Sequence, residues 1–288
     1  MTTPNETRRR FRALLAAPEI IAAPGVGDPL TGLLCQTLGI TAIHVSGSVA
    51  HRTHGYSDAG ILTLTEMVDR IAAMSDIVDL PLIADADTGF GGAVNVVRTV
   101  KDYERAGAAA IHFEDQVTPK RPTYQGSTGA FISTPEMVDK IRAAVDTRID
   151  PDLAIIARCD VPDRKVKLER LQACLEAGAD VGWLSSEDAE ETLFYTERFA
   201  GKPSIGVLPR GMTLKEYQNA GASCALLPGI LPIAALCAQK AVLEEVMSTG
   251  SAQGYLSTLP AIDEMTKFYN RQGNDELKRI EDAYSGTR

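Results

Sequence analysis

Short apolar runs alternate along the chain with longer amphipathic stretches, and this alternation is the strongest structural signal in the sequence. Three of the amphipathic stretches end in an Ala-Gly-Ala triplet centred on Gly107, Gly178 or Gly221, and an apolar run follows almost at once. Glycine accepts the left-handed conformation that ends many helices, so each triplet predicts a helix that stops just before a strand. Eight strands are predicted, at 20–23, 40–45, 80–84, 108–113, 153–157, 179–184, 203–208 and 222–227.

Helix starts are marked by Ser/Thr-x-x-Glu capping boxes, and Gly39 is a candidate helix end. A helix is expected over 5–16, and a polar loop over His51–Gly60. Eight parallel strands joined by crossover helices can close on themselves, which favours a (β/α)₈ TIM barrel over a doubly wound sheet. The capping boxes pair Thr63 with Glu66, Ser133 with Glu136 and Thr213 with Glu216.

The predicted organisation is a catalytic barrel over residues 1–248, with the first helix at its amino end, and a helical extension over 249–288. The extension is polar and charged, with an amphipathic patch at Ile262–Tyr269. We expect it to pack on the barrel or on a neighbouring subunit.

Composition narrows the function. The net charge is −9 and the longest basic cluster is Arg8–Arg10, so nucleic acid is not an expected partner. The chain has no apolar run of membrane-spanning length, and its amino terminus is polar. Five cysteines, an odd number without metal-type spacing, are typical of reduced core residues. We therefore expect a cytoplasmic protein without a membrane partner.

Acidic residues follow two of the predicted strands. Asp85 and Asp87 come after the run 80–84, and Glu114 and Asp115 come after 108–113. Side chains two residues apart on an extended chain point to the same side, so Asp85 and Asp87 are expected to converge on one cation through strand alternation. Asp-x-Asp alone often caps a helix. Acids at the carboxyl ends of two parallel strands, however, meet at the same end of a barrel, where they can share a divalent cation. The sequence therefore predicts an open metal site there.

One basic residue ends a predicted strand. Arg158 follows Leu-Ala-Ile-Ile-Ala, where a guanidinium needs an anionic partner. Its two-pronged donor geometry suits a substrate carboxylate, and the alternative is a structural salt bridge with one of the acids. A metal and an arginine together indicate a small, anionic, oxygen-rich substrate.

Several short motifs occur in one order over residues 28–158. Together they resemble the isocitrate lyase and phosphoenolpyruvate mutase superfamily, in particular its oxaloacetate decarboxylase and methylisocitrate lyase-like branch. The motifs are Ser46-Gly47-Ser48, Asp58, Ala84-Asp-Ala-Asp-Thr-Gly-Phe-Gly91, His112-Phe-Glu-Asp-Gln116, Pro119-Lys120-Arg121 and Ile156-Ala-Arg158.

The resemblance implies a barrel whose last helix is exchanged between subunits, commonly in a dimer of dimers. It implies Mg²⁺, with Mn²⁺ as a possible substitute, and chemistry through a metal-bound enolate. The segment 117–131 would gate the site. The implied metal residues are Asp85, Asp87, Asp58 and Glu114, and the implied substrate-binding residues are Ser46, Gly47, Ser48 and Arg158.

The sequence departs from the lyase branch of that family in ways that affect the reaction. Where the lyases carry Cys-Gly-His after the Lys-Arg pair, this chain continues with Pro-Thr-Tyr, and Ser185 stands where they carry Glu. Decarboxylation of a metal-chelated β-keto acid needs no base, whereas retro-aldol cleavage needs one. His51 and His54, near Asp58, are further proton-transfer candidates. The catalytic candidates are Arg158, Lys120, Tyr124 and His112.

The first functional hypothesis is a Mg²⁺-dependent carbon–carbon lyase acting on a small 2-oxo or 2-hydroxy di- or tricarboxylate, by decarboxylation or by retro-aldol cleavage. Phosphonate chemistry, of the phosphoenolpyruvate mutase or phosphonopyruvate hydrolase type, is the second. A weakly active homologue that only binds a small acid is the third. The expected partner is a small carboxylate, and the expected assembly is a homo-oligomer.

Overall fold

A computed structural model of the protein describes residues 2–121, 130–271 and 273–285. The chain divides into two compact units, Met1–Pro232 and Ile233–Arg288, and the division falls inside helix α10 (Ile230–Thr249). The expected boundary between barrel and extension after residue 248 stays a prediction.

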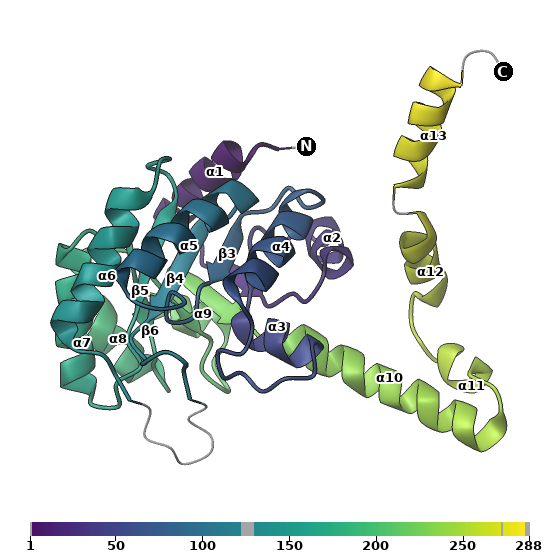
Figure 1. The fold of residues 1–288 in the computed structure, drawn as a ribbon. Helices are drawn as coiled ribbons and strands as arrows, with labels where there is room; N and C mark the ends of the chain where they lie inside the picture. The colour runs from purple at the N-terminus through teal and green to yellow at the C-terminus, as the bar shows by residue number, and fades with distance from the viewer. Residues whose placement is uncertain (1, 122–129, 272, 286–288) are drawn as a thin grey trace. The chain divides into compact units, whose positions relative to one another are not determined.

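The first unit is an eight-stranded parallel barrel, as predicted (Figure 1). The strand order is β1-β8-β7-β6-β5-β4-β3-β2, and a parallel bridge between Gly25 and His44 joins the two end strands. Every strand begins one to three residues later than expected, and in some cases the first predicted residue still belongs to the turn that ends the preceding helix. Ala108, for example, donates its N–H to the Tyr103 carbonyl. The strands are β1 Ile21–Pro24, β2 Ile43–Val45, β3 Leu82–Asp85, β4 Ala110–Glu114, β5 Ala154–Arg158, β6 Val181–Leu184, β7 Ser204–Val207 and β8 Cys224–Leu227.

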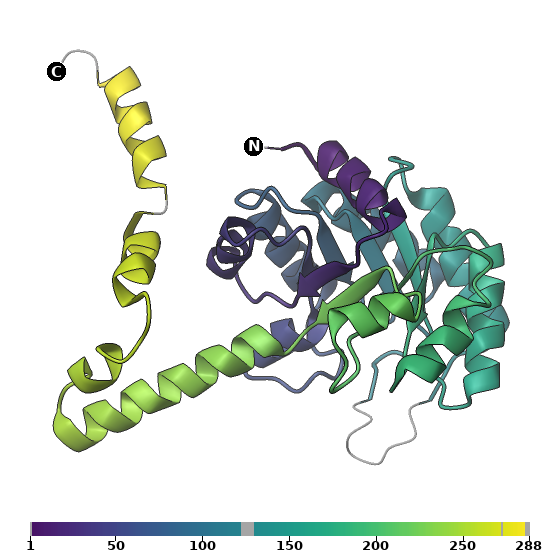
Figure 2. The ribbon, with the colours of Figure 1, turned by 180° about the vertical axis from the view of Figure 1, so that it is seen from behind.

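Helices follow the strands and surround the barrel (Figures 1 and 2). Gly107, Gly178 and Gly221 all have left-handed backbone angles, as predicted, with φ of 101°, 110° and 92°. The helices of the first unit are α1 Pro4–Ala16, α2 Pro29–Thr37, α3 Gly47–Thr53, α4 Leu64–Ser75, α5 Ala93–Ala106, α6 Thr134–Thr147, α7 Arg164–Glu176, α8 Ala189–Thr196, α9 Leu214–Asn219 and the start of α10.

The predicted capping boxes are confirmed at two helices and half-formed at a third. Thr63 and Thr213 exchange hydrogen bonds with the glutamates three residues later. The Ser133 hydroxyl accepts from the Glu136 N–H at 3.3 Å.

The loop expected over 51–60 is partly wrong, because residues 47–53 form α3. The Ser46 side chain is the N-cap of this helix and accepts a hydrogen bond from the Val49 N–H. Serine is a favoured N-cap because its hydroxyl accepts a hydrogen bond from an amide of the first turn that has no partner within the helix. The helix therefore starts immediately after β2.

The barrel interior is filled from its amino end. Phe11 and Leu15 of α1 pack in one buried cluster with inward-facing strand residues such as Ile83, Ile156 and Trp183. Helix α1 lies at one end of the barrel and α3 at the other (Figure 1). A second, larger cluster fills the layer between the strands and the outer helices. The amino end is thus closed by α1, which leaves the carboxyl ends of the strands for ligands.

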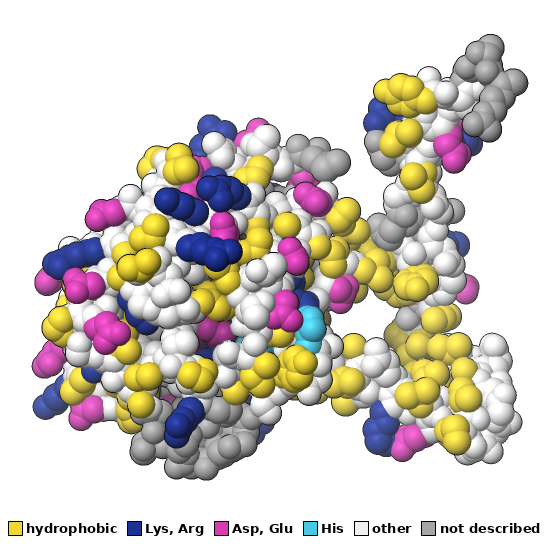
Figure 3. Space-filling view, viewed as in Figure 1, with side chains coloured by type: hydrophobic (Ala, Val, Ile, Leu, Met, Phe, Trp, Pro, Cys, Tyr) yellow, Lys and Arg dark blue, Asp and Glu magenta, His cyan; other side chains and the backbone are white. Residues whose placement is uncertain are grey.

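The second unit consists of helices, and α10 has no buried residue. Leu236, Leu243 and Met247 of α10 are 62–85% exposed, and apolar side chains gather on α10 and α11 in Figure 3. No helix within the described residues combines the length and the apolar character needed to cross a membrane. The remaining helices are α11 Gln253–Leu256, α12 Ile262–Arg271 and α13 Asn274–Tyr284.

Candidate active site

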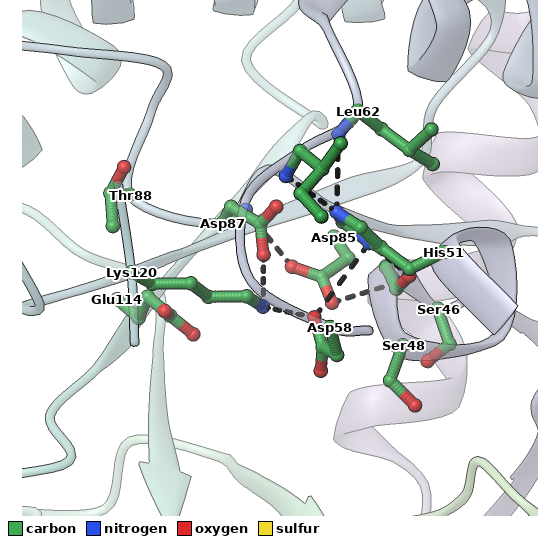
Figure 4. A network of polar contacts seen from close by, with 12 residues as sticks. Ser46, Ser48, His51, Asp58, Leu62, Asp85, Asp87, Thr88, Glu114 and Lys120 are labelled. Atoms are coloured by element: carbon green, nitrogen blue, oxygen red, sulfur yellow. Dashed lines mark hydrogen bonds and ion pairs between the residues drawn. The ribbon is translucent and has the colours of Figure 1, made fainter. Parts of the chain in front are cut away.

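Asp85 and Asp87 lie together at the carboxyl end of β3, but they do not converge through strand alternation. The strand ends at Asp85, and Asp87 has a left-handed φ of 47°. The Asp87 N–H donates to Asp85 Oδ1 at 2.9 Å, and the Gly47 N–H donates to Asp85 Oδ2 at 2.9 Å (Figure 4). A tight turn therefore brings the two carboxylates together.

The backbone at position 47 lies so close to the Asp85 carboxylate that only glycine fits there. A Cβ atom at this position would lie 2.7 Å from Asp85 Oδ2, closer than side-chain atoms approach each other. The absence of a side chain lets the helix amide reach the carboxylate. The expected substrate-binding segment Ser46-Gly47-Ser48 is thus the first turn of α3, beside Asp85, with its middle amide already bonded to that acid.

The Lys120 ammonium lies between two of the predicted metal residues. Its Nζ is 2.7 Å from Asp58 Oδ1 and also contacts Asp87 Oδ1 (Figure 4). Burial alone would lower the pKa of Lys120, but Glu114 and the three aspartates around it raise the pKa above its usual value. Lys120 is therefore a buried, permanently charged cation in an acidic cluster.

Glu114 and Arg158 are register partners on adjacent strands β4 and β5. Arg158 Nη1 is 3.3 Å from Glu114 Oε2, yet both oxygens of Glu114 are buried without a hydrogen-bond partner. Burial raises the pKa of Glu114 to about 8. A buried carboxylate without donors is costly, so this group is suited to receive a cation.

Arg158 is held on one edge by Asp160, a residue that the sequence analysis missed. Its Nε donates to Asp160 Oδ1 at 3.1 Å, and its Nη2 is 2.7 Å from Asp160 Oδ2. The guanidinium also lies 4.7 Å above the Trp183 ring. The salt bridge with Asp160 agrees with the structural interpretation of Arg158. The Nη1 end points toward Glu114, within the acidic cluster, which leaves the substrate-binding interpretation open.

Asp115 is separate from this cluster. Its carboxylate accepts from the Asp160 N–H at 2.7 Å and pairs with Arg170 at 2.9 Å. Asp115 thus supports the turn that carries Asp160.

The catalytic candidate His112 is fully buried beneath the acids. Its Nε2 lies 3.1 Å from His44 Nε2, its Nδ1 lies 3.6 Å from Asp85 Oδ1, and its ring packs on Trp183. Burial lowers the pKa of His112 to about 4 and that of His44 to about 3. Both imidazoles are neutral at neutral pH.

The pKa values of the two aspartates near the end of β3 are shifted in opposite directions. Burial would raise the pKa of Asp85, but His112 and the cations Lys120 and Arg158 hold it below its usual value. Burial and the charge of Asp85 raise the pKa of Asp87. Asp85 is therefore the more firmly ionised of the pair.

The described residues fit a divalent metal on two grounds. The carboxylates of Asp58 and Asp87 already contact a cation, the Lys120 ammonium, and Glu114 has no donor. Ligand atoms of His44, Asp85 and His112 also lie within 4.8 Å of one another. Carboxylate oxygens suit Mg²⁺ and Mn²⁺, and imidazole suits transition metals better than Mg²⁺.

The remaining candidates lie apart from the acids or outside the described residues. Tyr124 belongs to the segment 122–129, outside the described part of the chain. His54 is exposed, and its Nδ1 bonds to the Ala50 carbonyl at 2.9 Å. His44 and Asp160 each lie two residues from a motif residue that the sequence analysis used.

Comparison with known proteins identifies the class. A family model described as phosphoenolpyruvate phosphomutase matches residues 11–247. A 2,3-dimethylmalate lyase from Eubacterium barkeri is 36% identical over 288 residues, covering 97% of this chain and 98% of the relative.

Two solved structures extend this likeness to three dimensions. Oxaloacetate acetylhydrolase with the inhibitor 3,3-difluorooxalacetate is 28% identical with a TM-score of 0.89, covering 99% of each chain. Phosphonopyruvate hydrolase in complex with oxalate and Mg²⁺ is 28% identical with a TM-score of 0.86, also covering 99% of each chain.

The chain belongs to the isocitrate lyase and phosphoenolpyruvate mutase superfamily, as its motifs indicated. Within that superfamily it is a carbon–carbon lyase, in keeping with the relative that matches it over nearly its whole length.

Proposed function

We propose that the protein is a Mg²⁺-dependent lyase that cleaves a carbon–carbon bond of a small 2-oxo or 2-hydroxy di- or tricarboxylate, with Mn²⁺ as an alternative metal. The match with 2,3-dimethylmalate lyase supports a 2-hydroxy acid, and the likeness to oxaloacetate acetylhydrolase supports a 2-oxo acid. The choice of metal is supported by the solved phosphonopyruvate hydrolase, which is a complex with oxalate and Mg²⁺.

The acidic cluster at the mouth of the barrel is the observation that carries this proposal. Asp58, Asp85, Asp87 and Glu114 come from three different parts of the barrel and surround one cation, Lys120. These four acids would hold the metal. When bound, the metal acts as a Lewis acid toward the oxygen on which negative charge develops during cleavage.

Arg158 would bind a substrate carboxylate. Asp160 occupies the edge formed by Nε and Nη2, so the Nη1 end, which makes only the 3.3 Å contact with Glu114, is the part that can serve a ligand. The Trp183 ring below the guanidinium limits its movement further. Asp160 and Trp183 therefore orient the arginine, which reduces the entropy lost when substrate binds.

Lys120 would act as a fixed positive charge, not as a base. Its acidic neighbours raise its pKa, so it keeps its proton at neutral pH. His112, being neutral and bonded to His44, would supply shape and hydrogen bonding beneath the site. Tyr124 remains a proposed proton donor, and the first turn of α3, with Ser46 and Ser48, a proposed contact for the substrate.

We also propose a homo-oligomer, a dimer of dimers with an exchanged last helix, in the cytoplasm. The apolar side chains exposed on α10 support a protein–protein contact. Light scattering coupled to gel filtration tests the assembly, and a monomer at micromolar concentration would contradict it.

Pyruvate formation tests the proposed reaction. Cleavage of a 2-methylated malate and decarboxylation of oxaloacetate both release pyruvate, which lactate dehydrogenase detects through NADH. The panel should hold substituted malates, oxaloacetate and methylisocitrate, with Mg²⁺ and with chelator. We expect metal-dependent pyruvate release from at least one acid. Release of phosphate from phosphonopyruvate, without cleavage of any panel acid, would instead assign phosphonate chemistry.

A further inference from the structure

His51 is a fully buried histidine whose two ring nitrogens both bond to the backbone. It lies on α3, and its Nδ1 is 2.8 Å from the Gly47 carbonyl oxygen. Its Nε2 accepts from the N–H groups of Ile61 and Leu62 at 3.0 and 3.2 Å (Figure 4). One imidazole thus joins α3 to the segment that follows it.

The partners of His51 assign its tautomer. Backbone amides only donate, so Nε2 must carry the lone pair. The proton is then on Nδ1, which donates to the Gly47 carbonyl. With both nitrogens engaged, the ring has no free site for proton transfer, although Nδ1 lies 3.7 Å from Asp58 Oδ1.

The contacts of His51 continue to both sides of the acidic cluster. The Gly47 peptide bonds to His51 through its carbonyl and to Asp85 through its N–H. Ile61 and Leu62 end the segment that begins after α3 and carries Asp58. A continuous series of hydrogen bonds therefore joins Asp85, Gly47, His51 and the Asp58 segment.

We propose that His51 is a positioning residue that sets the Asp58 segment relative to Gly47 and Asp85, and so shapes the metal site without touching metal or substrate. The inference rests on the proposed function, because it takes Asp85 and Asp58 as metal residues. It replaces the expectation that His51 transfers a proton.

The imidazole of His51 supplies a donor and an acceptor on opposite sides of one rigid ring. Phenylalanine fills the same volume without either. Glutamine offers both functions on a flexible chain, so it restores the contacts in part. His51→Phe would remove the acceptor of the buried Leu62 amide and of the part-buried Ile61 amide, and the side-chain donor to the Gly47 carbonyl, and His51→Gln is the conservative variant.

The first experiment reads the hydrogen bonds directly in the metal-free protein. Nitrogen-15 spectra of labelled histidines are expected to show His51 as the Nδ1–H tautomer. Amide hydrogen exchange at Ile61 and Leu62 is expected to be slow in the wild type, faster in His51→Gln and fastest in His51→Phe. An Nε2–H tautomer, or equally slow exchange in a folded His51→Phe, would overturn the proposal.

The second experiment measures metal affinity, with Mn²⁺ followed by electron paramagnetic resonance and Mg²⁺ by calorimetry. We expect His51→Phe to weaken binding by about 10–100-fold, as loss of an outer partner of a metal site does, and His51→Gln by less. His54→Phe is the matched control, at the exposed C-cap of the same helix, and should keep wild-type affinity. Equal affinity in wild type and His51→Phe would overturn the proposal.

The two experiments also separate this inference from the proposed function. If the wild type binds neither metal, the proposed metal site fails, while the tautomer and the exchange data still decide whether His51 holds the segment. If His51→Phe does not fold, His51→Gln and the wild-type spectra decide the question.

Discussion

Both ends of the barrel contain buried ionisable groups, but the two ends differ in how completely hydrogen bonds satisfy them. At the amino end, Arg8 donates to the carbonyls of Ala108 and Glu104 and pairs with Asp150 at 3.0 Å. The Glu104 carboxylate accepts from the N–H groups of Ile149 and Asp150. At the carboxyl end, Glu114 is buried near Arg158 Nη1, 3.3 Å from its Oε2, but neither carboxylate oxygen has a hydrogen-bond partner.

This difference indicates that the charged groups at the amino end stabilise the fold, whereas those at the carboxyl end serve the active site. Arg12 and Asp180, also at the amino end, line a cavity of about 720 Å³, yet they are ion-paired at 2.9 Å. A cavity whose charged side chains are already paired with each other has few groups left to bind a ligand. At the carboxyl end, acids from different strands lie close together and neither Glu114 oxygen has a hydrogen-bond partner, which suits a site for a metal and an acid.

Removal of the central acid at the carboxyl end should have the largest effect. Asp85→Ala is expected to lower turnover by at least about 1000-fold, because it removes a metal residue together with the charge stabilisation that the metal provides. Steady-state kinetics over a Mg²⁺ titration, with circular dichroism to confirm folding, measure this. Activity near the wild-type level would exclude the proposed metal site.

Removal of a satisfied charge at the amino end should affect stability alone. Arg8→Ala is expected to lower the free energy of unfolding by about 3–5 kcal/mol, since it removes the cation paired with Asp150 and the buried donors to the carbonyls of Ala108 and Glu104. Urea unfolding measures the loss, with the exposed Arg9→Ala as control. Metal affinity of the folded fraction should be unchanged, and a large drop in that affinity would mean that the two ends are coupled.

Arg158→Lys sharpens the comparison at the carboxyl end. An ammonium cannot bond to Asp160 through two nitrogens and also serve a ligand, so we expect KM to rise roughly tenfold, about the cost of one charge-assisted contact. Initial-rate kinetics on the best panel acid measure this. Unchanged KM and kcat would leave Arg158 with its structural salt bridge only.

The smallest effect is a pH dependence of the metal-free protein. Burial raises the pKa of Glu114 from 4.5 to about 8, so between these values the folded state holds a proton that the unfolded chain releases. The contribution of Glu114 to stability therefore falls as pH rises through this interval.

Glu114→Gln isolates this contribution, because it has no proton to lose. Urea unfolding with chelator at about pH 5 and about pH 8 should show a smaller decrease in stability for the variant than for the wild type. Parallel decreases in the two proteins would show that Glu114 titrates normally.

The fold and part of the site could be predicted from the sequence. Strand ends follow from where apolar runs stop, which placed Asp85, Glu114 and Arg158 at one end of the barrel. Asp160 was missed because its contact depends on the turn after β5. The contact between His44 and His112 joins residues 68 apart in the sequence, and no local pattern encodes it.

The direction of the Asp87 carboxylate was equally beyond the sequence, since it follows from a left-handed turn rather than from strand geometry. The helix start at Gly47 was masked by its polar surroundings. The backbone angle of Asp87 sets the direction of its carboxylate, and the Ser46 cap sets where α3 begins.

The left-handed backbone of Asp87 also constrains how this protein can change over evolutionary time. Apart from glycine, only aspartate and asparagine adopt that conformation readily. An Asp87→Asn substitution during evolution would therefore remove the carboxylate and keep the same turn. A member of the family could therefore lose this metal-site carboxylate, and with it activity, without any change in the backbone at this position.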